Sequence, residues 1–447
     1  MRQIHLGAMF PGTNSNTVWN DPRSGSYLDF DTYVQFAGNA EQAKFDFVFF
    51  AEGLRLREQN GRIYERDLAT RPDNFTVLAA LAAVTDRIGL TATINSTFNE
   101  PYEVARQFAT LDHLCAGRAG WNVVTSWDRF VGENFRRGSF LRKEQRYERA
   151  ELFLDAVMRI MASWRDGDLL VDKESGRFVA DPDVGAFEHR DAQFDIAGHF
   201  GVPPGPQGRP VVFQAGTSDE GREFAAARAD AIFGMYSPVE EKIAFYADVK
   251  GRLARYGRTN DSLLILPAST FAIGDTDAEA REVAMAVRHQ QVDGRTAITF
   301  LESLWNRDLS AYDPDGPLPE VDPLLEGTRA SELAGVRHYP DRIATAREWR
   351  ELAEAKNYTI RELVIHIMGW QTFIGSPSTI ADQMMSMVSA GACDGFIMVP
   401  HILPHALEQF TATVVPILQE RGVFRSEYEG TTLRDHLGVS AAAASTR

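Results

Sequence analysis

The sequence predicts an α/β protein, a closed (β/α)8 TIM barrel with insertions, including a large one after the seventh strand. Short apolar segments alternate with longer amphipathic segments along the 447 residues, and this alternation is typical of parallel βαβ units. Eight such units favour a closed barrel over an open sheet. The length suits one large barrel with insertions, although it also suits two or three smaller domains.

Each expected strand is a short apolar run. The eight runs are Ile4–Phe10, Phe45–Phe50, Ile88–Asn95, Gly120–Thr125, Val211–Ala215, Ala231–Met235, Leu263–Ile273 and Gly395–Val399. The expected helices between and after them have apolar residues at helical spacing: Thr32–Lys44, Asn74–Asp86, Pro101–Leu114, Arg142–Trp164, Asp219–Arg228, Val239–Tyr256, Thr379–Ala390 and His405–Arg421. Pro101 suits the first position of its helix, where its missing amide hydrogen is not needed.

Two stretches interrupt the alternation. Asp166–Gly208 is rich in Asp, Gly and Pro, and Gly274–Gly375 contains helical pieces (Asp277–Val292, Arg342–Lys356, Ile360–Met368) around the Pro/Asp-rich tract Tyr312–Asp322. We expect one domain over residues 1–438 with insertions at 166–208 and 274–375, followed by a flexible tail at 439–447. The second insertion is expected to be a lid over the barrel mouth; the alternative is a packing or oligomer-contact element.

Composition excludes several classes of protein. The net charge of −16 without a basic block argues against nucleic-acid and anionic-membrane partners. Two cysteines, Cys115 and Cys393, are too few for a disulfide framework or a cysteine zinc site. The sequence contains neither the long apolar run of a signal peptide nor that of a membrane span. A cytoplasmic location is therefore expected.

Polar side chains occupy alternate positions on two strands that should be buried. They are Thr91, Thr93, Asn95 and Thr97 on the third strand, and Asn122 and Ser126 on the fourth. An unpaired buried hydroxyl or amide costs about 1–3 kcal/mol, so these positions indicate a ligand that accepts or donates their hydrogen bonds. Alternatively, they bond one another or buried water.

A second candidate site is the turn Gln214-Ala215-Gly216-Thr217-Ser218, where a strand runs directly into a helix. Free amide groups and the positive end of the helix dipole at such a turn can hold a phosphate, but Ser218 alone also explains it as a helix cap. The sequence has no Walker A run and no Gly-x-Gly-x-x-Gly, which disfavours a nucleoside triphosphate or a Rossmann-bound dinucleotide.

Glu52 and Tyr147 can each be interpreted either as a functional residue or as a structural one. Glu52 follows the second strand, where barrel enzymes place functional groups, but it could equally pair with Arg55 or Arg57. Tyr147 begins an apolar helical stripe and is either a core aromatic residue or a phenol within reach of a phosphate.

Aromatic residues follow several strands: Phe10, Trp19, Phe98 and Trp127. They are candidates for an apolar substrate pocket for a flat ring, and equally for packing. No metal-binding spacing of histidines, no nucleophile elbow and no catalytic acid–base group stands out. We therefore expect no metal, leave the catalytic residues unknown, and expect a cofactor to supply the difficult chemistry.

One run carries a family resemblance. Leu111-Asp112-His113-Leu114-Cys115-Ala116-Gly117-Arg118-Ala119-Gly120-Trp121-Asn122-Val123-Val124-Thr125-Ser126 resembles a signature of the bacterial-luciferase-like FMN-dependent monooxygenases, in the branch of nitrilotriacetate, EDTA and dibenzothiophene-sulfone monooxygenases. Shorter matches are Phe98–Tyr102, Gln145–Glu148, Phe213–Gly216 and Gly375–Pro377, so the resemblance extends over most of the chain.

The resemblance implies a TIM barrel that binds FMN, as FMNH2 supplied by a separate NAD(P)H:flavin reductase. It implies cofactor contacts at Glu52, Thr93 or Asn95, Asn122, Ser126, Tyr147, Gly216 and Thr217, and a homo-oligomer. The sequence departs from the family pattern at two positions. Many relatives have Asp where Glu52 stands, and some alkane-oxidising relatives have a histidine where Trp127 stands, so a histidine-assisted step at that position is not expected.

The predicted function is a two-component flavin monooxygenase. FMNH2 and O2 would form a flavin hydroperoxide that oxidises or cleaves a C–N, C–S or C–H bond of a small organic substrate, inside a pocket closed to water. The alternatives are a deazaflavin-dependent oxidoreductase and a non-catalytic flavin-binding protein on the same barrel. The substrate stays open, since Trp127 and Phe98 suggest an apolar pocket whereas Arg55 or Arg57 could bind a carboxylate or sulfonate.

Overall fold

The computed structural model describes residues 3–59, 62–63, 68, 70–126, 129–135, 141–142, 145–234, 238–325, 339, 341–368 and 371–439. Its centre is a closed barrel of parallel strands in the order β1-β16-β13-β12-β11-β6-β5-β2, which confirms the predicted fold class. The barrel strands are β1 (His5–Phe10), β2 (Phe47–Phe50), β5 (Gly89–Asn95), β6 (Ala119–Val124), β11 (Val211–Gln214), β12 (Ala231–Gly234), β13 (Leu264–Ser269) and β16 (Gly395–Met398).

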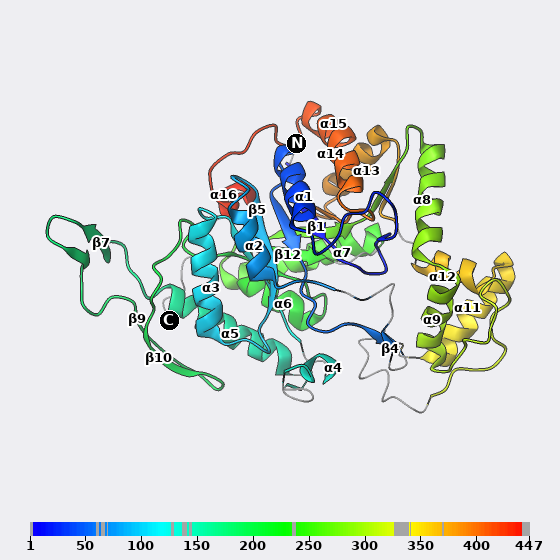
Figure 1. Ribbon diagram of the computed structural model, residues 1–447, viewed down its shortest axis with the longest axis horizontal. Coiled ribbons are helices and arrows are strands. Elements are labelled where there is room, and N and C mark those ends of the chain that lie inside the picture. The colour runs from blue at the N-terminus through cyan, green and yellow to red at the C-terminus, as the bar shows by residue number, and fades with distance from the viewer. Residues whose placement is uncertain are drawn as a thin grey trace.

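Helices surround this barrel (Figure 1). Those that alternate with the barrel strands along the chain are α1 (Phe30–Gln42), α2 (Asn74–Ala82), α3 (Pro101–Leu114), α5 (Arg146–Met161), α6 (Asp219–Arg228), α7 (Val239–Arg252), α13 (Pro377–Ser389) and α14 (His405–Thr413). Pro101 and Pro377 stand in the first turn of their helices, as expected. The predicted helix His405–Arg421 is two helices, α14 and α15 (Val415–Glu420), because Pro416 cannot continue the hydrogen-bond ladder of α14.

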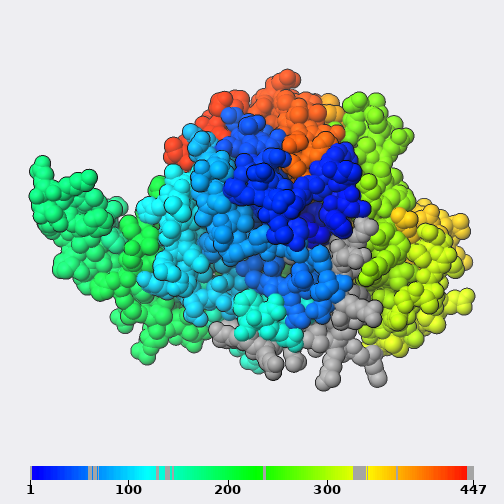
Figure 2. Space-filling view, viewed as in Figure 1, coloured from blue at the N-terminus to red at the C-terminus, as the bar shows by residue number. Residues whose placement is uncertain are grey.

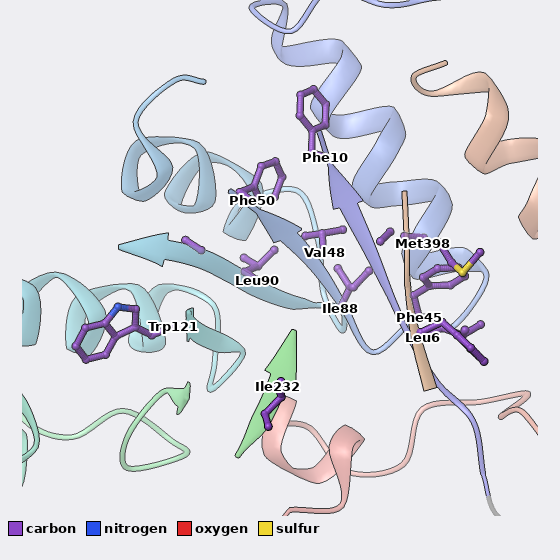
Figure 3. Close-up of a cluster of buried hydrophobic side chains, with 14 of the residues drawn as sticks. Leu6, Phe10, Phe45, Val48, Phe50, Ile88, Leu90, Trp121, Ile232 and Met398 are labelled. Carbon is purple, nitrogen blue, oxygen red and sulfur yellow. The ribbon is translucent and has the colours of Figure 1, made fainter. Parts of the chain in front are cut away.

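The main core lies between the barrel and its helices. Side chains that point outward from the strands, among them Leu6, Val48, Leu90, Trp121 and Met398, are fully buried there (Figure 3). Because neighbouring residues on a strand point to opposite faces, the alternate residues fill the barrel interior. Both faces of each strand are therefore buried, which explains why the strands are continuous apolar runs.

The lower end of the barrel interior is closed by a helix near the end of the described chain, α16 (Leu433–Leu437). A Cβ atom added to Gly89 would lie 2.4 Å from Cδ1 of Leu433, and one added to Gly7 would lie 2.4 Å from the ring of Phe47. Glycine at these positions leaves the space that Leu433 and Phe47 fill. The barrel is thus packed solid at the amino ends of its strands and can hold a ligand only toward the carboxyl ends.

Three buried aspartates connect neighbouring strands at the amino ends. Each stands immediately before its own strand and accepts the backbone amide of the adjacent strand. Asp46 before β2 accepts Leu6 N of β1 at 2.7 Å, Asp230 before β12 accepts Val212 N of β11 at 2.9 Å, and Asp394 before β16 accepts Ile265 N of β13 at 2.8 Å. Each carboxylate also pairs with a cationic side chain: Arg425, Arg209 and the buried Lys250, respectively.

One expected strand was wrong in extent. Leu263–Ile273 is not a single barrel strand but two, β13 and β14 (Phe271–Ile273), and β14 pairs outside the barrel with β15 (Phe373–Gly375). Backbone bonds between Thr270 and the Thr372–Phe373 segment start this second pairing, which no local pattern in Leu263–Ile273 reveals. The short β14–β15 ladder joins the two ends of the segment 274–375 to the barrel.

The segment between residues 166 and 208 forms two hairpins, β7–β8 (Leu169–Asp172, Arg177–Val179) and β9–β10 (Ala186–Arg190, Asp195–His199). They project away from the barrel, at the left of Figures 1 and 2. A further two-stranded ladder, β3–β4 (Glu58–Gln59, Arg62–Ile63), and the short helix α4 (Arg129–Gly132) belong to the loops after β2 and β6.

The segment between residues 274 and 375 is helical: α8 (Asp277–Gln291), α9 (Gly294–Trp305), α11 (Arg342–Lys356) and α12 (Ile360–Met368). The expected pieces did not include α9, although its apolar stripe and the cap from Asp293 to Thr296 N are regular. Trp305, Leu301, Trp349 and Leu363 belong to a hydrophobic core that is separate from that of the barrel. Within the described part of the chain, none of the helices combines the length and apolar character needed to span a membrane.

Asp230 supplies a test of the strand-connecting aspartates. Burial alone would raise the pKa of this carboxyl, but Arg209, Arg434 and the Val212 amide hold it below its usual value. Asp230→Asn leaves two arginines without their anion, so we expect a loss of about 3–5 kcal/mol in the free energy of unfolding by denaturant. Asp382→Asn removes the anion from the exposed pair with Arg421 and should cost at most about 1 kcal/mol.

The comparison of the wild-type chain with Asp230→Asn also gives a test by pH. A carboxyl whose folded pKa is depressed stabilises the fold above its unfolded pKa of about 3.8, and this contribution disappears as the pH falls through the folded pKa. The wild-type chain should therefore lose stability more steeply below pH 4 than Asp230→Asn. Parallel acid profiles for the two proteins would contradict this account.

Candidate active site

A cavity of about 280 Å³ opens at the carboxyl ends of the barrel strands. Its walls come from β1, β2, β5, β6, β11, β12 and the loops that follow them: Met9, Phe49, Ala51, Glu52, Leu54, Thr93, Asn122, Val124, Ser126, Val131, Ala215 and Phe233. Four of the eight predicted cofactor contacts are therefore together in one cavity, which we call the central cavity. Its size lies at the lower end of the range of small-molecule sites.

One wall of the central cavity is polar. The β5–β6 ladder pairs Thr93 with Asn122. Across this pair, Asn122 Nδ2 donates to Thr93 Oγ1 at 3.0 Å. Asn122 Oδ1 is buried and has no hydrogen-bond partner among the described residues. An acceptor left unpaired in this way costs about 1–3 kcal/mol, so the arrangement suits a ligand that donates a hydrogen bond from within the cavity. Thr93 and Asn122 thus bond each other, as expected if the polar strand residues satisfy one another. Asn122 Oδ1 nevertheless remains as an unused acceptor.

The opposite wall is apolar and aromatic. Phe49 and Phe233 stack with their ring centroids 5.0 Å apart and an interplanar angle of 10°, and Met9 lies beside them. Sequence reasoning did not select these three residues. For Phe49, the alternation along β2 places Phe47, Phe49 and Ala51 on one face of the strand. Because both faces of β2 are apolar and buried, the sequence does not show which of the two sets of residues points into the barrel.

Glu52 lies at the rim of the central cavity and is held by Asn95. Asn95 Nδ2 lies 3.1 Å from each carboxylate oxygen of Glu52, while Asn95 Oδ1 accepts the amides of Thr97 and Phe98 at 3.1 and 2.7 Å. The Asn95 side chain is thus engaged within the protein and orients Glu52. Burial raises the pKa of Glu52 to about 7, against the opposing effect of the Asn95 hydrogen bonds. The carboxyl group is therefore able to gain or lose a proton near neutral pH.

Arg55 and Arg57 were the two predicted alternative partners of Glu52, and the ion pair with Arg55 is not formed. Arg55 instead donates to Glu133 at 2.7 Å and Glu58 at 3.1 Å. Its charge is balanced by these two carboxylates. Arg71 Nη1 donates to the backbone oxygen of Glu52 at 2.8 Å and so fixes the chain at this point.

The β11–α6 turn lies next to the central cavity, because Ala215 lines the cavity and Gly216 follows it. A Cβ atom on Gly216 would lie 2.1 Å from the Tyr147 hydroxyl oxygen and 2.4 Å from Gln214 Nε2. Only glycine permits this approach of the Tyr147 phenol to the turn. Ser218 caps α6 by accepting Gly221 N at 3.3 Å, and Thr217 is exposed. The Tyr147 hydroxyl, Gly216 and Thr217 are thus neighbours, although Tyr147 comes from a different helix.

The predicted substrate-pocket residues are not together. Phe10 and Trp19 line a second cavity, separate from the central one, below the loop that connects β1 to α1. Phe98 is among the described lining residues of neither cavity and stacks on Phe135 with ring centroids 4.4 Å apart. Trp127 lies outside the described residues. Within those residues, no group of three or more His, Cys, Asp or Glu side chains could hold a metal ion.

A closed parallel barrel with a half-polar, half-aromatic cavity at the carboxyl ends of its strands defines an α/β-barrel enzyme. Comparison with known proteins identifies its family: residues 10–393 match the model of the luciferase-like monooxygenases, and the chain belongs to this family. The chain is 38% identical to N-acetyl-S-(2-succino)cysteine monooxygenase of Bacillus subtilis (strain 168) and 37% identical to nitrilotriacetate monooxygenase component A of Aminobacter aminovorans. Each alignment covers 98% of this chain and 97% of the relative.

A solved structure of similar fold is that of riboflavin lyase with modified FMN and its substrate riboflavin. It has a TM-score of 0.79 and 29% sequence identity, and the alignment covers 98% of this chain and 96% of that one. These comparisons confirm the family that the Leu111–Ser126 run predicted, and with it the enzyme class, a flavin-dependent monooxygenase.

Glu52 gives this site a testable pH dependence. Because its pKa is higher in the folded chain than the unfolded value of 4.5, stability should fall as the pH rises from 4.5 through about 7, where the folded protein must accommodate an ionised carboxylate. Glu52→Gln should remove this decline, which amounts to about 3 kcal/mol at most. Glu103→Gln, on an exposed helical pair with Arg106, is the control. Denaturant midpoints between pH 4.5 and 8 measure the difference, and an unchanged slope in Glu52→Gln would refute the assignment.

Proposed function

We propose that this chain is the oxygenase component of a two-component monooxygenase that uses FMNH2 and O2 to oxidise or cleave a C–N, C–S or C–H bond of a small organic substrate. One observation carries the proposal: the central cavity reaches Ala215, and the next residue, Gly216, leaves room for the Tyr147 hydroxyl. A half-polar cavity suits a flat heterocycle, and a glycine turn before a helix suits a phosphate.

The chemical types of the described residues fit the parts of FMN. The unpaired Asn122 Oδ1 is an acceptor for an N–H group of the ring, and Thr93 holds the amide in that orientation. Phe49 and Phe233 offer an apolar wall to the ring system. Gly216, Thr217, Ser126 and Tyr147 would hold the phosphate. In this proposal Asn95 contributes by orienting Glu52, since its own amide is already bonded within the protein.

Reduced FMN, when bound, supplies the electrons that activate O2. The protein contributes orientation, a proton-holding group and the exclusion of water. With a pKa of about 7, Glu52 holds or releases a proton at its carboxylate near neutral pH, which is the range in which a general acid or base is effective. The apolar wall and the packed lower half of the barrel exclude water from below.

The helical insertion at 274–375 is proposed to act as a lid. Gln291 Nε2, at the end of α8, donates to Asn16 O in the β1–α1 loop at 2.7 Å, so the insertion contacts a loop on the mouth side of the barrel. Closing the mouth would keep the reactive cofactor and substrate away from bulk water. This contact is the observation that supports the lid.

The remaining components of the proposal rest on the relatives and on composition. A relative named component A supports a partner NAD(P)H:flavin reductase as the source of FMNH2. We also propose a homo-oligomer and a cytoplasmic location. The two cysteines are buried and are not joined in a disulfide, which accords with a reducing compartment.

The decisive experiment combines the purified chain, FMN, a flavin reductase, NADH and ¹⁸O2 with candidate sulfones, aminopolycarboxylates and alkanes. One ¹⁸O atom should appear in the product, and only in the presence of both FMN and the chain. Flavin binding without incorporation of oxygen for any candidate would favour the non-catalytic alternative. Binding of a deazaflavin in preference to FMN would favour the deazaflavin-dependent oxidoreductase.

Tyr147→Phe tests the phosphate end of the proposed site. Removal of a hydroxyl that bonds a charged phosphate should weaken FMN binding by about 1.5–3 kcal/mol, roughly ten- to a hundredfold in Kd. Tyr256→Phe removes a hydroxyl that bonds Glu223 on the surface and should leave FMN affinity unchanged. Anaerobic titration with FMNH2 measures both, and equal affinities would return Tyr147 to a packing role.

Gly216→Ala tests the close approach at the turn. The new methyl group would overlap the Tyr147 hydroxyl and Gln214 Nε2, so the phenol must move and the affinity for FMN should fall at least as much as in Tyr147→Phe. Gly201→Ala is the control, because an added Cβ there meets no atom within 4 Å. If Gly216→Ala binds FMN like the wild type, the turn is not part of the site.

A further inference from the structure

Two loops at the mouth of the barrel meet beside the central cavity. Leu54 in the loop after β2 and Val131 in α4, which follows β6, both line this cavity. Asn134 Nδ2 donates to Leu54 O at 2.9 Å, so residues 129–135, which we call the α4 segment, are bonded to the β2 loop at the cavity itself. In Figure 1, α4 lies near the lower edge of the view, away from the helix α16 that closes the amino ends of the strands.

Arg55 joins the β2 loop to the α4 segment. Its Nη1 atom donates to Phe130 O at 2.5 Å and to Glu133 Oε2 at 2.7 Å. Its Cζ atom lies 3.7 Å from the centre of the Phe130 ring, which is a cation–π contact. Its Nη2 atom donates to Glu58 Oε1 at 3.1 Å, within the β2 loop. A planar guanidinium can stack on a ring and donate in several directions at once, which the compact ammonium of a lysine cannot do.

The α4 segment is held by these polar and stacking contacts rather than by a hydrophobic core. Phe130 is only 4% exposed, yet within the described residues it belongs neither to the barrel core nor to the cores of the insertion and of the barrel base. Phe135 stacks on Phe98 of the loop after β5 with an interplanar angle of 5°, but it is 46% exposed. A segment with few buried apolar contacts can open while the rest of the protein stays folded. The α4 segment can therefore move away from the cavity without disruption of the barrel.

The contacts of Arg55 make this attachment dependent on charge. The side chains of Arg55 and Glu133 are 19% and 38% exposed, so their ion pair is partly open to water and is weakened by salt. Glu58 pairs with Arg55 inside the β2 loop, whereas Glu133 pairs with it from the α4 segment. If the α4 segment moves away, Arg55 keeps Glu58 as its anion and Glu133 reaches water. Opening thus leaves no buried charge without a partner.

The proposed reaction requires a cover of this kind. FMNH2 that comes from a separate reductase must enter the site and FMN must leave it, yet the site must be closed to water during the oxygen chemistry. We propose that the α4 segment is a movable cover of the central cavity, and that Arg55 is the positioning residue that holds it closed and thereby sets how fast FMN enters and leaves. The inference rests on the proposed function and deepens it by naming the residues that control the exchange of the cofactor.

The test is the exchange kinetics of oxidised FMN with the full chain. Stopped-flow flavin fluorescence at several protein concentrations gives the association rate constant from the slope and the dissociation rate constant from the intercept. Arg55→Met keeps a long side chain without its charge. Both rate constants should rise about tenfold in this variant while Kd changes less than about threefold, because the cover opens more often and the contacts to the flavin remain.

Arg228→Met is the matched control. Arg228 also pairs with two carboxylates, Glu151 and Asp155, but it lies at the end of α6 that is remote from the β11–α6 turn. The control removes the same charge as Arg55→Met and should leave both rate constants unchanged. Salt should accelerate exchange in the wild type and in Arg228→Met, and much less in Arg55→Met, since the screened ion pair is then absent.

Glu133→Gln is a second variant that keeps the test decisive if Arg55→Met fails to fold, because Glu133 is exposed. It should accelerate exchange in the same direction. The double variant should exchange no faster than Arg55→Met alone, since both changes remove one shared contact. A role of Arg55 in stability alone would change neither the rate constants nor their dependence on salt.

Unchanged rate constants in both Arg55→Met and Glu133→Gln overturn the inference. A rise in the dissociation rate constant alone also overturns it, because this would mean lost contacts with the flavin rather than an opened cover. If the wild-type chain does not bind FMN, the proposed function fails instead. The cover is then measured without flavin, by amide hydrogen exchange of residues 53–58 and 129–135, which should be faster in Arg55→Met than in the wild type and Arg228→Met. Equal exchange in the three proteins would overturn the inference.

Discussion

Three carboxylates at the amino ends of the barrel strands, those of Asp46, Asp230 and Asp394, each accept a backbone amide from the neighbouring strand. Each bond joins the start of one strand to its neighbour at a defined residue and so helps to set the register of the barrel. The register in turn places Thr93 beside Asn122 and brings the ends of β5 and β6 to the same level. The arrangement of the candidate site at the carboxyl ends thus depends on interactions at the opposite end of the same strands.

The barrel interior is divided along its axis. Its lower part is filled by Phe47, Phe213 and Leu433, and α16 closes it from below. Its upper part is divided again, with amide and hydroxyl groups on β5 and β6 and aromatic rings on β2 and β12. A filled base removes any path for water from below, so the chemistry is confined to one open end where loops and the helical insertion can cover it. This division explains how a single barrel can provide both a rigid support and a site for a reactive cofactor.

Electrostatics near the mouth are arranged by burial and internal pairing. Arg55 and Arg23 are each balanced by carboxylates of the protein, and His401 is kept neutral by burial. Glu52 is the exception, because burial brings its pKa to about 7 and leaves it close to the point of ionisation. Among the described residues, Glu52 is thus a carboxyl group beside the central cavity that can hold or release a proton near neutral pH.

Much of the fold followed from local pattern. The eight apolar runs, the helices that begin at Pro101 and Asp219, and the turn at Gly216 were all apparent, because strand alternation, caps and glycine turns depend on neighbouring residues. The helix α9 and the division of Leu263–Ile273 into β13 and β14 were missed. The partner of β14 is β15, about a hundred residues further along the chain, and no local property encodes that pairing.

The sequence by itself determined the barrel, the family and the polar positions on β5 and β6, since these follow from periodicity and from one long run of residues. Only the tertiary structure decided that Asn95 serves Glu52 rather than the cavity, that Tyr147 meets Gly216, and that Phe10 and Trp19 belong to a cavity apart from Thr93 and Asn122. The physical reason is that a side chain's partners are chosen by the three-dimensional register of strands and loops, whereas the sequence specifies only which partners it is able to take.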